Sequence, residues 1–330
     1  MSNFKFALNT LLLPLVNRGV RIQEKPSRFL WVVFILRDLS RLRRPHCSLI
    51  GRFIKVNRIE AITLEQKSSL PSIEALVVST RKDFEILGLC ILSIGESSAN
   101  QIERISIIVP NSDLEECQSL IAGLGITIPY HVIDEDNFLT VEVRDRIKRL
   151  FGNRYGWALQ QVLTVEFIRR NHSRGVLVVN SDTILLKKMV WLDDLLRQPL
   201  MPTWEYHKPY YDFLESLSPS FAGIKQSFIS HHMLMQPIIF RETLTAIGIE
   251  SIEELLQKVE IYADLSNNSA VCLEFEIYAQ GLLVFNSDLA LITKWSNIGL
   301  SRANKATLFA QIEQLRLKGQ FRSVSIHSWS

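Results

Sequence analysis

The sequence is poor in cysteine, and its cysteines have no spacing that suits a zinc ribbon or a disulfide framework. There are four among 330 residues, and none belongs to a C-x-x-C pair. Small disulfide-rich domains and zinc ribbons depend on dense or paired cysteines, so neither class is indicated. A reducing cytosol fits this cysteine usage best.

Long apolar runs are also missing. The two strongest, FALNTLLLPLV at 6–16 and RFLWVVFIL at 28–36, are far shorter than the roughly 18 to 20 residues that cross a bilayer as a helix. The first run lacks the small-residue cleavage site of a secretory signal. We therefore expect a cytoplasmic protein that does not span a membrane.

Net charge is small, +3 in total, but it is unevenly distributed. Residues 1–55 contain eleven Lys or Arg against two acids, a net charge of +9, which leaves −6 for the rest of the chain. A basic segment of this kind indicates an anionic partner for one end of the protein.

Two interpretations of this basic segment stay open. Its Lys and Arg, beside Trp31 and Phe34, suit an amphipathic arm that lies peripherally at the inner face of an anionic membrane. Alternatively, its apolar clusters pack on the main domain and leave a solvated basic face. Nucleic acid is disfavoured as a partner because no stacking motif accompanies the charge. In either case we expect residues 1–72 to form a basic, amphipathic, helical N-terminal extension.

From Glu74 onward, short apolar runs alternate with amphipathic stretches. This rhythm is typical of β-α-β units around a mostly parallel sheet flanked by helices. The expected strands are 75–80, 105–110, 128–134 and 175–180, and the expected helices are 84–97, 113–125 and 156–171. Ser112 or Asp113 is the expected N-cap of the second helix. We therefore expect one α/β domain over residues 73–330.

The run GVLVVNSDTILL at 175–186 ends a buried strand in an amide, two hydroxyls and a carboxylate. Burying such groups unpaired costs several kcal/mol, so this cluster needs an explanation. Side chains alternate along an extended strand, which puts Asn180 and Asp182 on one side, roughly 7 Å apart. Ligands collect at the carboxyl edge of a parallel sheet, and these oxygens suit a divalent cation with its phosphates. By itself, the pattern also fits a strand-to-helix turn with Asp as its cap.

Other segments carry further polar groups. The first strand ends in STRKDFEIL, whose polar residues are Thr80, Arg81, Lys82 and Asp83. They lie at the same sheet edge and suit a nucleotide's base, ribose or phosphates. Three later segments contain His231 and His232 (SFISHHMLM), Glu274 and Glu276 (CLEFEIYAQG) and His327 (SIHSWS). The aromatic segment 202–219 is either a packed loop or a platform for an acceptor sugar.

The sequence segments described above, taken in this order, resemble those of the GT-A glycosyltransferases and, more narrowly, of bacterial glycosyltransferase-like families. Those families share an opening strand with a charged turn, an SDT strand end, an aromatic segment before HHM, and an E-(F/Y)-E-x-Y segment. The resemblance covers residues 73–330. It implies a Rossmann-like GT-A fold and a transferase of polysaccharide biosynthesis, which moves a sugar from a nucleotide-diphosphate-sugar donor to a saccharide or lipid-linked acceptor.

On the donor side, the resemblance implies a divalent metal, Mn²⁺ or Mg²⁺. Asp182 would bind it and His327 would complete its coordination. Asn180 stands where the families have the first acid of Asp-x-Asp, and would be a neutral helper. Gln160 and Gln161 match a W-x-x-Q-Q element that reaches the donor sugar.

On the acceptor side, the resemblance implies a general base among the glutamates. Residues two apart in a helix face different ways, so only one of the two can serve. We expect Glu274 to be the base and Glu276 to cap the helix or to pair with a cation. His232 is the expected acceptor contact.

Two other functions stay open from the sequence. Asn180 in place of an acid fits a degenerate protein that binds a nucleotide sugar or a glycan without turnover. A sugar nucleotidyltransferase shares the sheet topology, but STRKDFEIL lacks the glycine-rich phosphate loop expected after its first strand.

Overall fold

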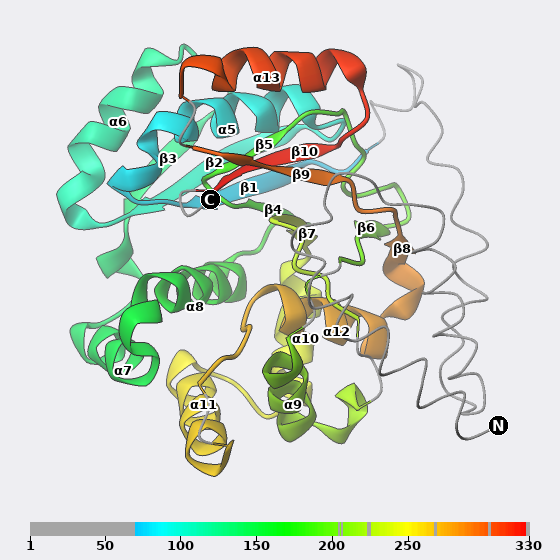
Figure 1. The fold of residues 1–330 in the computed structure, drawn as a ribbon. Coiled ribbons are helices and arrows are strands. Elements are labelled where there is room, and N and C mark those ends of the chain that lie inside the picture. Colours follow the sequence, from blue (N-terminus) through cyan, green and yellow to red (C-terminus); the bar gives the residue numbers. More distant parts are fainter. Residues whose placement is uncertain are drawn as a thin grey trace, which may run out of the picture.

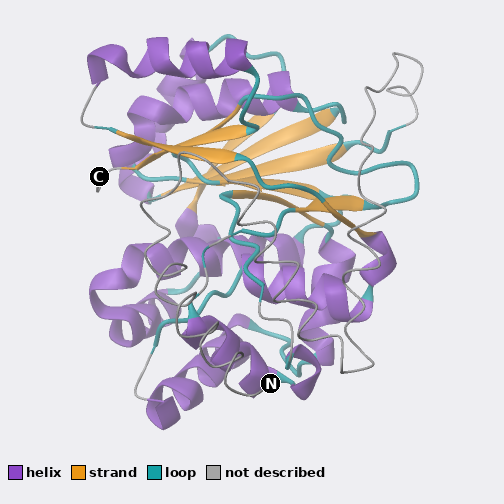
Figure 2. Ribbon diagram, turned by 45° about the vertical axis from the view of Figure 1, so that its right-hand side comes forward, coloured by secondary structure: helices purple, strands orange, loops and turns teal. Residues whose placement is uncertain are grey.

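The computed structural model of the chain describes residues 70–203, 205, 207–222, 226–266, 269–302 and 305–327. Within them, a five-stranded sheet lies between two layers of helices (Figures 1 and 2). This arrangement confirms the expected α/β class with a mostly parallel sheet flanked by helices.

The central strands of the main sheet are buried apolar segments, as strands covered on both faces must be, whereas the edge strand β3 is only partly buried. Its strands are Ile73–Val78 (β1), Ile102–Val109 (β2), Tyr130–Asp134 (β3), Val176–Val179 (β4) and His232–Met235 (β7). Their order is β3-β2-β1-β4-β7. The first four run parallel and β7 runs antiparallel to β4, so the amino end of β7 meets the carboxyl end of β4.

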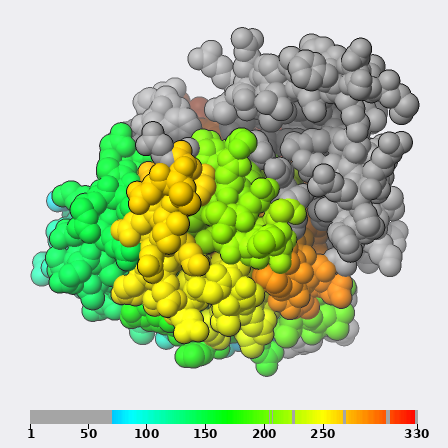
Figure 3. All heavy atoms as spheres, turned by 90° about the horizontal axis from the view of Figure 1, so that it is seen from below, coloured from blue at the N-terminus to red at the C-terminus, as the bar shows by residue number. Residues whose placement is uncertain are grey.

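Helices α5 (Phe84–Ser97) and α6 (Leu114–Gly123) cover one face of this sheet, where their apolar residues join those of β1 and β2 in one core cluster (Figure 1). A larger helical layer covers the other face. It contains α7 (Val141–Phe151), α8 (Tyr155–Arg170), α9 (Lys208–Leu217), α10 (Pro237–Ala246), α11 (Ile252–Ser266) and α12 (Phe275–Phe285). Helices α9 and α11 lie side by side on the outside of this layer (Figure 3).

A second sheet has the order β5-β10-β9, and helix α13 packs with it in a third core cluster. The elements are Thr183–Leu185 (β5), Asn297–Ser301 (β9), Lys305–Lys318 (α13) and Ser323–His327 (β10). β10 pairs with β5 antiparallel. This pairing brings the carboxyl end of the described chain next to the segment that follows β4.

The remaining elements are short. Strands Gln198–Leu200 (β6) and Ala290–Ile292 (β8) form a two-stranded sheet. The 3-10 helices are Arg81–Asp83 (η2), Asn111–Asp113 (η3), Glu135–Asn137 (η4), Gly152–Arg154 (η5), Pro219–Phe221 (η6) and Ser287–Leu289 (η7). Among the described residues, no helix combines the length and the apolar character needed to cross a membrane.

The four expected strands and three expected helices are confirmed, with ends that shift by at most three residues. One local expectation is wrong. The chain does not stay extended after Val179, because the Thr183 N–H donates to the Asn180 carbonyl (2.9 Å) and closes a turn. The strand-alternation argument for Asn180 and Asp182 therefore does not hold.

The expected domain boundary is untested. β1 begins at Ile73, but all of the expected extension except residues 70–72 lies outside the described residues. Trp204 and Tyr206 of the aromatic segment also lie outside them, whereas Tyr211 and Phe213 are buried in the core.

Candidate functional site

Three chain segments with polar residues meet at the carboxyl edge of the parallel strands. They are the turn after β1, the turn after β4, and the residue before β7. The Asn180 N–H donates to the His231 carbonyl (2.9 Å), which fixes the last two segments together. The strand order reverses between β1 and β4, and ligands of open α/β sheets bind at such switch points, outside the carboxyl ends of the strands.

The four residues after β1 have different surroundings. Thr80, Arg81 and Lys82 are exposed, and Asp83 is buried. Arg81 forms an ion pair with Glu116 (2.9 Å). Thr80 and Lys82 are therefore the two exposed residues of this turn that form no ion pair with a described residue.

Asp83 ties the turns after β1 and β4 to a distant residue. Its carboxylate accepts hydrogen bonds from Ser181 Oγ (2.8 Å) and Arg302 Nη2 (2.8 Å). Arg302 also donates to the Lys82 carbonyl (2.7 Å). Arg302 follows β9 and lies more than 200 residues from Asp83 in sequence, so no local pattern could have placed it in the site. Asp83 thus organises the site while its charge is already paired.

Asp182 and His327 form a more accessible pair at the same edge. His327 Nδ1 lies 4.0 Å from Asp182 Oδ2, and the side chains of His327 and Asp182 are 16% and 26% exposed. The Ile326 N–H donates to the Asp182 carbonyl (2.8 Å), so the pairing of β10 with β5 positions His327. Burial raises the pKa of Asp182, as does Asp83, whereas His327 and Arg302 lower it. A cation at this carboxylate would favour its charged form.

Asn180 lies between two side chains from different elements. Gln160 Nε2 of α8 donates to Asn180 Oδ1 (3.3 Å), and Asn180 Nδ2 lies 3.4 Å from His231 Nδ1. Burial and His327 lower the pKa of His231 to about 4, so its neutral ring can accept from the Asn180 amide. His231 has a φ of 64°, a conformation uncommon for residues other than glycine and concentrated at functional sites.

His232 faces away from this edge. It is 1% exposed, and its ring packs edge-on against Trp191 at 5.5 Å. Its Nε2 lies 3.0 Å from Ser323 Oγ, which itself donates to Asn297 Oδ1. Nε2 must therefore carry the proton and donate to Ser323. These contacts suit a packed core histidine, and the acceptor role expected for His232 stays a prediction without support. His231 is the histidine at the site.

The two glutamines of α8 also separate. Gln160 reaches Asn180, but Gln161 is buried, and its Oε1 accepts from the Leu273 N–H (2.7 Å). Gln161 therefore fixes the chain just before Glu274 and has no direct access to a ligand at Asn180.

Glu274 and Glu276, two residues apart, have opposite hydrogen-bonding situations. Glu274 directly precedes α12, is 5% exposed, and interacts with Thr164 of α8, while its Oε2 has no partner among the described residues. Burial raises its pKa to about 7. We call the polar residues at the carboxyl strand ends the strand-end cluster: Asp83, Asn180, Asp182, His231, Arg302 and His327. Since Thr164 lies about one helical turn from Gln160, α8 connects Glu274 with this cluster.

Glu276 is completely buried and fully bonded. Its carboxylate accepts from four donors: Tyr211 Oη (3.3 Å), Ser227 Oγ (2.9 Å), the Phe228 N–H (3.0 Å) and Gln280 Nε2 (3.1 Å). Burial raises its pKa to about 7 as well. All four donors belong to the protein, so the hydrogen bonds of Glu276 hold the fold together. Glu274, in contrast, has a carboxylate oxygen without a hydrogen-bond donor among the described residues.

The strand-end cluster suits a cation shared with a ligand, and does not suit one held by protein alone. Asp83 and Asp182 carry two negative charges and Arg302 one positive charge, so these three groups would repel a diphosphate. Among the described residues, no three His, Cys, Asp or Glu side chains converge on one point as metal ligands. Asp182 and His327 would supply two ligands to a cation bound here, and a hard cation commonly takes the rest from phosphates and water.

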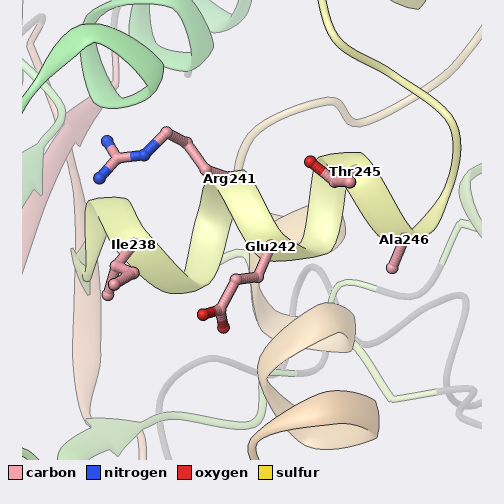
Figure 4. A pocket seen from close by; sticks show the side chains of 5 residues that line it. All are labelled: Ile238, Arg241, Glu242, Thr245 and Ala246. Carbon is pink, nitrogen blue, oxygen red and sulfur yellow. The ribbon is translucent and has the colours of Figure 1, made fainter.

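A shallow depression on the surface lies elsewhere and takes no part in this cluster. Figure 4 shows its lining residues, all on α10: Ile238, Arg241, Glu242, Thr245 and Ala246. Arg241 donates to the Asn171 carbonyl (2.6 Å) just beyond the end of α8. This places the depression towards the amino edge of the parallel strands, opposite Asn180.

No curated protein matches the chain in sequence. Solved structures that match in fold include the crystal structure of mouse xyloside xylosyltransferase 1 in its apo form. It is 13% identical, the match covers 77% of this chain and 97% of that one, and the TM-score is 0.44. A galactosyltransferase, LgtC, solved with donor and acceptor sugar analogues, is 10% identical, with 78% and 87% coverage and a TM-score of 0.45.

A family model matches residues 81–307, a span that includes the turn after β1, the turn after β4, both glutamates and Arg302. It describes a family of unknown function, DUF6492. Since the match extends over more than half of the sequence, the chain belongs to this family.

Proposed function

We propose that the protein is a GT-A glycosyltransferase, which moves a sugar from a nucleotide-diphosphate-sugar donor to a saccharide or lipid-linked acceptor. The observation that carries the proposal is the partly exposed Asp182–His327 pair beside Asn180, at the carboxyl edge where β4 meets the antiparallel β7. Thr80 and Lys82, exposed after β1, are the proposed nucleotide contacts. Gln160, bonded to Asn180, is the proposed contact of the donor sugar.

In this proposal, Asp182 and His327 bind Mn²⁺ or Mg²⁺ together with the donor. When bound, the cation neutralises the charge of the diphosphate leaving group. Asp83 and Arg302 hold the turns after β1 and β4 in place through their own ion pair. This pair needs no ligand, so the site is organised before the donor binds.

Glu274 is the proposed general base. Its Oε2, without an internal partner, takes the proton of the acceptor hydroxyl as that oxygen attacks the donor sugar. A pKa raised to about 7 suits the role, because a base works best when its pKa lies near the working pH. Gln161 holds the preceding residue, Leu273, and thereby positions Glu274.

A second function is favoured by one feature of the same cluster. Asn180 is neutral, and the described residues contain no group of three metal ligands. These observations support a protein that binds a nucleotide sugar or a glycan without turnover.

Hydrolysis of nucleotide sugars, with and without Mn²⁺, distinguishes the two functions. If water takes the place of a missing acceptor, a transferase releases nucleotide diphosphate slowly, and we expect this release to depend on the cation. Binding of the same nucleotide sugars without any release, with or without added saccharides, would favour the non-catalytic function.

The basic N-terminal segment leads to a separate proposal, association with anionic membranes. Each Lys or Arg near an anionic surface contributes about 1 kcal/mol, so Arg43→Gln with Arg44→Gln should weaken binding to anionic liposomes roughly 30-fold. Co-sedimentation of the full chain at low and high salt measures this. Lys148→Gln with Arg149→Gln, two exposed positions on α7, is the matched control and should bind as wild type does. Weakening by the α7 pair alone would place the contact on the α/β domain, equal weakening by both pairs would contradict a contact specific to the segment, and no binding by wild type would favour packing of the segment on that domain.

A further inference from the structure

Four side chains form a cationic and aromatic cluster at the start of α8 and α9. The Cζ atom of Arg154 lies 3.9 Å from the centre of the Trp157 ring. Trp157 and Tyr210 are stacked at 6.2 Å, and His207 packs edge-on against Tyr210 at 4.7 Å. We call these residues the Arg154 cluster. Nothing in the proposed donor chemistry uses them.

Arg154 is the single charged group of this cluster at neutral pH. Burial, opposed in part by Arg154, raises the pKa of Tyr210 to about 12, so its phenol stays neutral. Burial and Arg154 lower the pKa of His207, which favours its neutral ring. The Arg154 guanidinium makes one long hydrogen bond, to Tyr210 Oη (3.4 Å).

No carboxylate of the described residues pairs with Arg154, in contrast to other partly buried arginines of this chain. Arg146 pairs with Glu260 and Arg169 with Glu166. Stacking on Trp157 nevertheless holds the Arg154 guanidinium, which reduces the entropy it would lose on binding a ligand. Its in-plane N–H donors therefore form an ordered cationic site without a counter-ion in the part of the chain that the structure describes.

The Arg154 cluster borders the candidate site. Trp157 and Gln160 are three residues apart in α8 and share one face of the helix, and Gln160 bonds Asn180. Trp157 lies about one helical turn nearer the amino end of α8 than Gln160, and so farther from Asn180. Asp182 directly precedes β5 and His327 ends β10 of the second sheet, which packs with α5 and α13, whereas α8 covers the other face of the main sheet. The Arg154 cluster and the Asp182–His327 pair thus flank Asn180 from two sides.

We propose that the Arg154 cluster is a subsite for an anionic saccharide, whose carboxylate or phosphate group binds the Arg154 guanidinium. The fork of N–H donors matches the two oxygens of such a group, and the exposed His207 can bond sugar hydroxyls beside it. That this saccharide is the acceptor rests on the proposed function. The inference adds a substrate class to it: the acceptor carries a negative charge near the hydroxyl that receives the sugar.

Calorimetric titration of the full chain with three probes tests this subsite without any donor. The probes are a disaccharide ending in glucuronate, the same disaccharide ending in glucose, and glucose 1-phosphate. We expect at least one anionic probe to bind about tenfold or more tightly than the neutral one, as a charged hydrogen bond warrants. The two anionic probes distinguish a carboxylate from a phosphate as the recognised group.

Arg154→Gln should remove this preference, whereas Arg174→Gln should retain it, since Arg174 is an exposed arginine before β4 at the opposite sheet edge. Thermal unfolding of both variants checks that the fold is kept. Equal binding of all three probes by wild type, or an unchanged preference in Arg154→Gln, would overturn the proposal.

Titration of nucleotide diphosphate with Mn²⁺ separates this subsite from the proposed function. If Arg154→Gln weakens the nucleotide and leaves the saccharides unaffected, Arg154 belongs to the donor site and the subsite proposal is wrong. If wild type binds anionic saccharides but no nucleotide, the subsite stands as a glycan-binding site and the transferase proposal fails.

Discussion

Replacing Asp182 with Asn should lower the turnover of the donor sugar by about two orders of magnitude or more while the fold stays intact. The change keeps the shape of the side chain and removes the one accessible negative charge next to His327. Burial raises the pKa of Asp182, so its charge is costly in the free protein, and its loss should not reduce stability. Turnover at saturating Mn²⁺ and the urea midpoint of unfolding measure the two effects.

Asn180→Ala is the matched control for that variant. It removes hydrogen bonds to Gln160 and His231 but no charge, so its effect on turnover should be smaller. Equal activity of wild type and Asp182→Asn would place the cation elsewhere. A larger loss in Asn180→Ala than in Asp182→Asn would mean that positioning of the donor, and not charge, governs the site.

Glu274→Gln and Glu276→Gln should separate activity from stability. Glu274→Gln removes the proposed base, so transfer to an acceptor should fall about 100-fold or more, with nucleotide binding retained. Glu276→Gln turns an acceptor of four internal hydrogen bonds into a group that is partly a donor, which should reduce the free energy of unfolding by about 2 kcal/mol. Transfer assays, nucleotide titration and urea unfolding of both variants measure these effects. If the effects were exchanged between the two variants, Glu276 would be the base.

The raised pKa of Glu274 predicts how stability and transfer change with pH. Burial raises the pKa of Glu274 to about 7, above the value of about 4.3 in an unfolded chain. The folded state therefore binds more protons between these values, and the stability contributed by this carboxyl is present below about pH 4.3 and lost as pH rises through about 7. Transfer should increase over that upper range as Glu274 loses its proton. In Glu274→Gln, stability should decline less than in wild type from pH 5 to 7.

The strands and helices of the main sheet can be predicted from the sequence because the spacing of apolar residues that defines each of them lies within one short segment. The helix at 84–97 is a case where the pattern and the structure agree at both ends, since its buried face and its polar ends lie within one segment. The turn at Asn180 is the opposite case. The chain turns after β4, and Thr183 pairs with Ser325 of β10. Nothing in the sequence of residues 175–186 indicates that distant partner.

The difference between the candidate site residues also depends on distant partners. Glu274 and Glu276 have the same chemistry in sequence, and Tyr211, Ser227 and Phe228, which make Glu276 structural, come from other elements. Arg302 lies in a stretch without a motif, and β9 brings it to Asp83. His231 and His232 are adjacent in sequence, but His231 contacts Asn180 whereas His232 in β7 packs against Trp191. A pattern can name the residue types of such a site, but tertiary pairing decides which of them face a ligand.

Thermal unfolding with a panel of nucleotide sugars and Mn²⁺ tests the central claim, that the strand-end cluster binds a nucleotide diphosphate together with a cation. A ligand at about 100 times its dissociation constant adds about 2.7 kcal/mol to the free energy of unfolding. We expect at least one nucleotide sugar to stabilise the wild-type protein by this order, less so without Mn²⁺, and not at all in Asp182→Asn. A flat response over the whole panel, or equal stabilisation of wild type and Asp182→Asn, would contradict the claim.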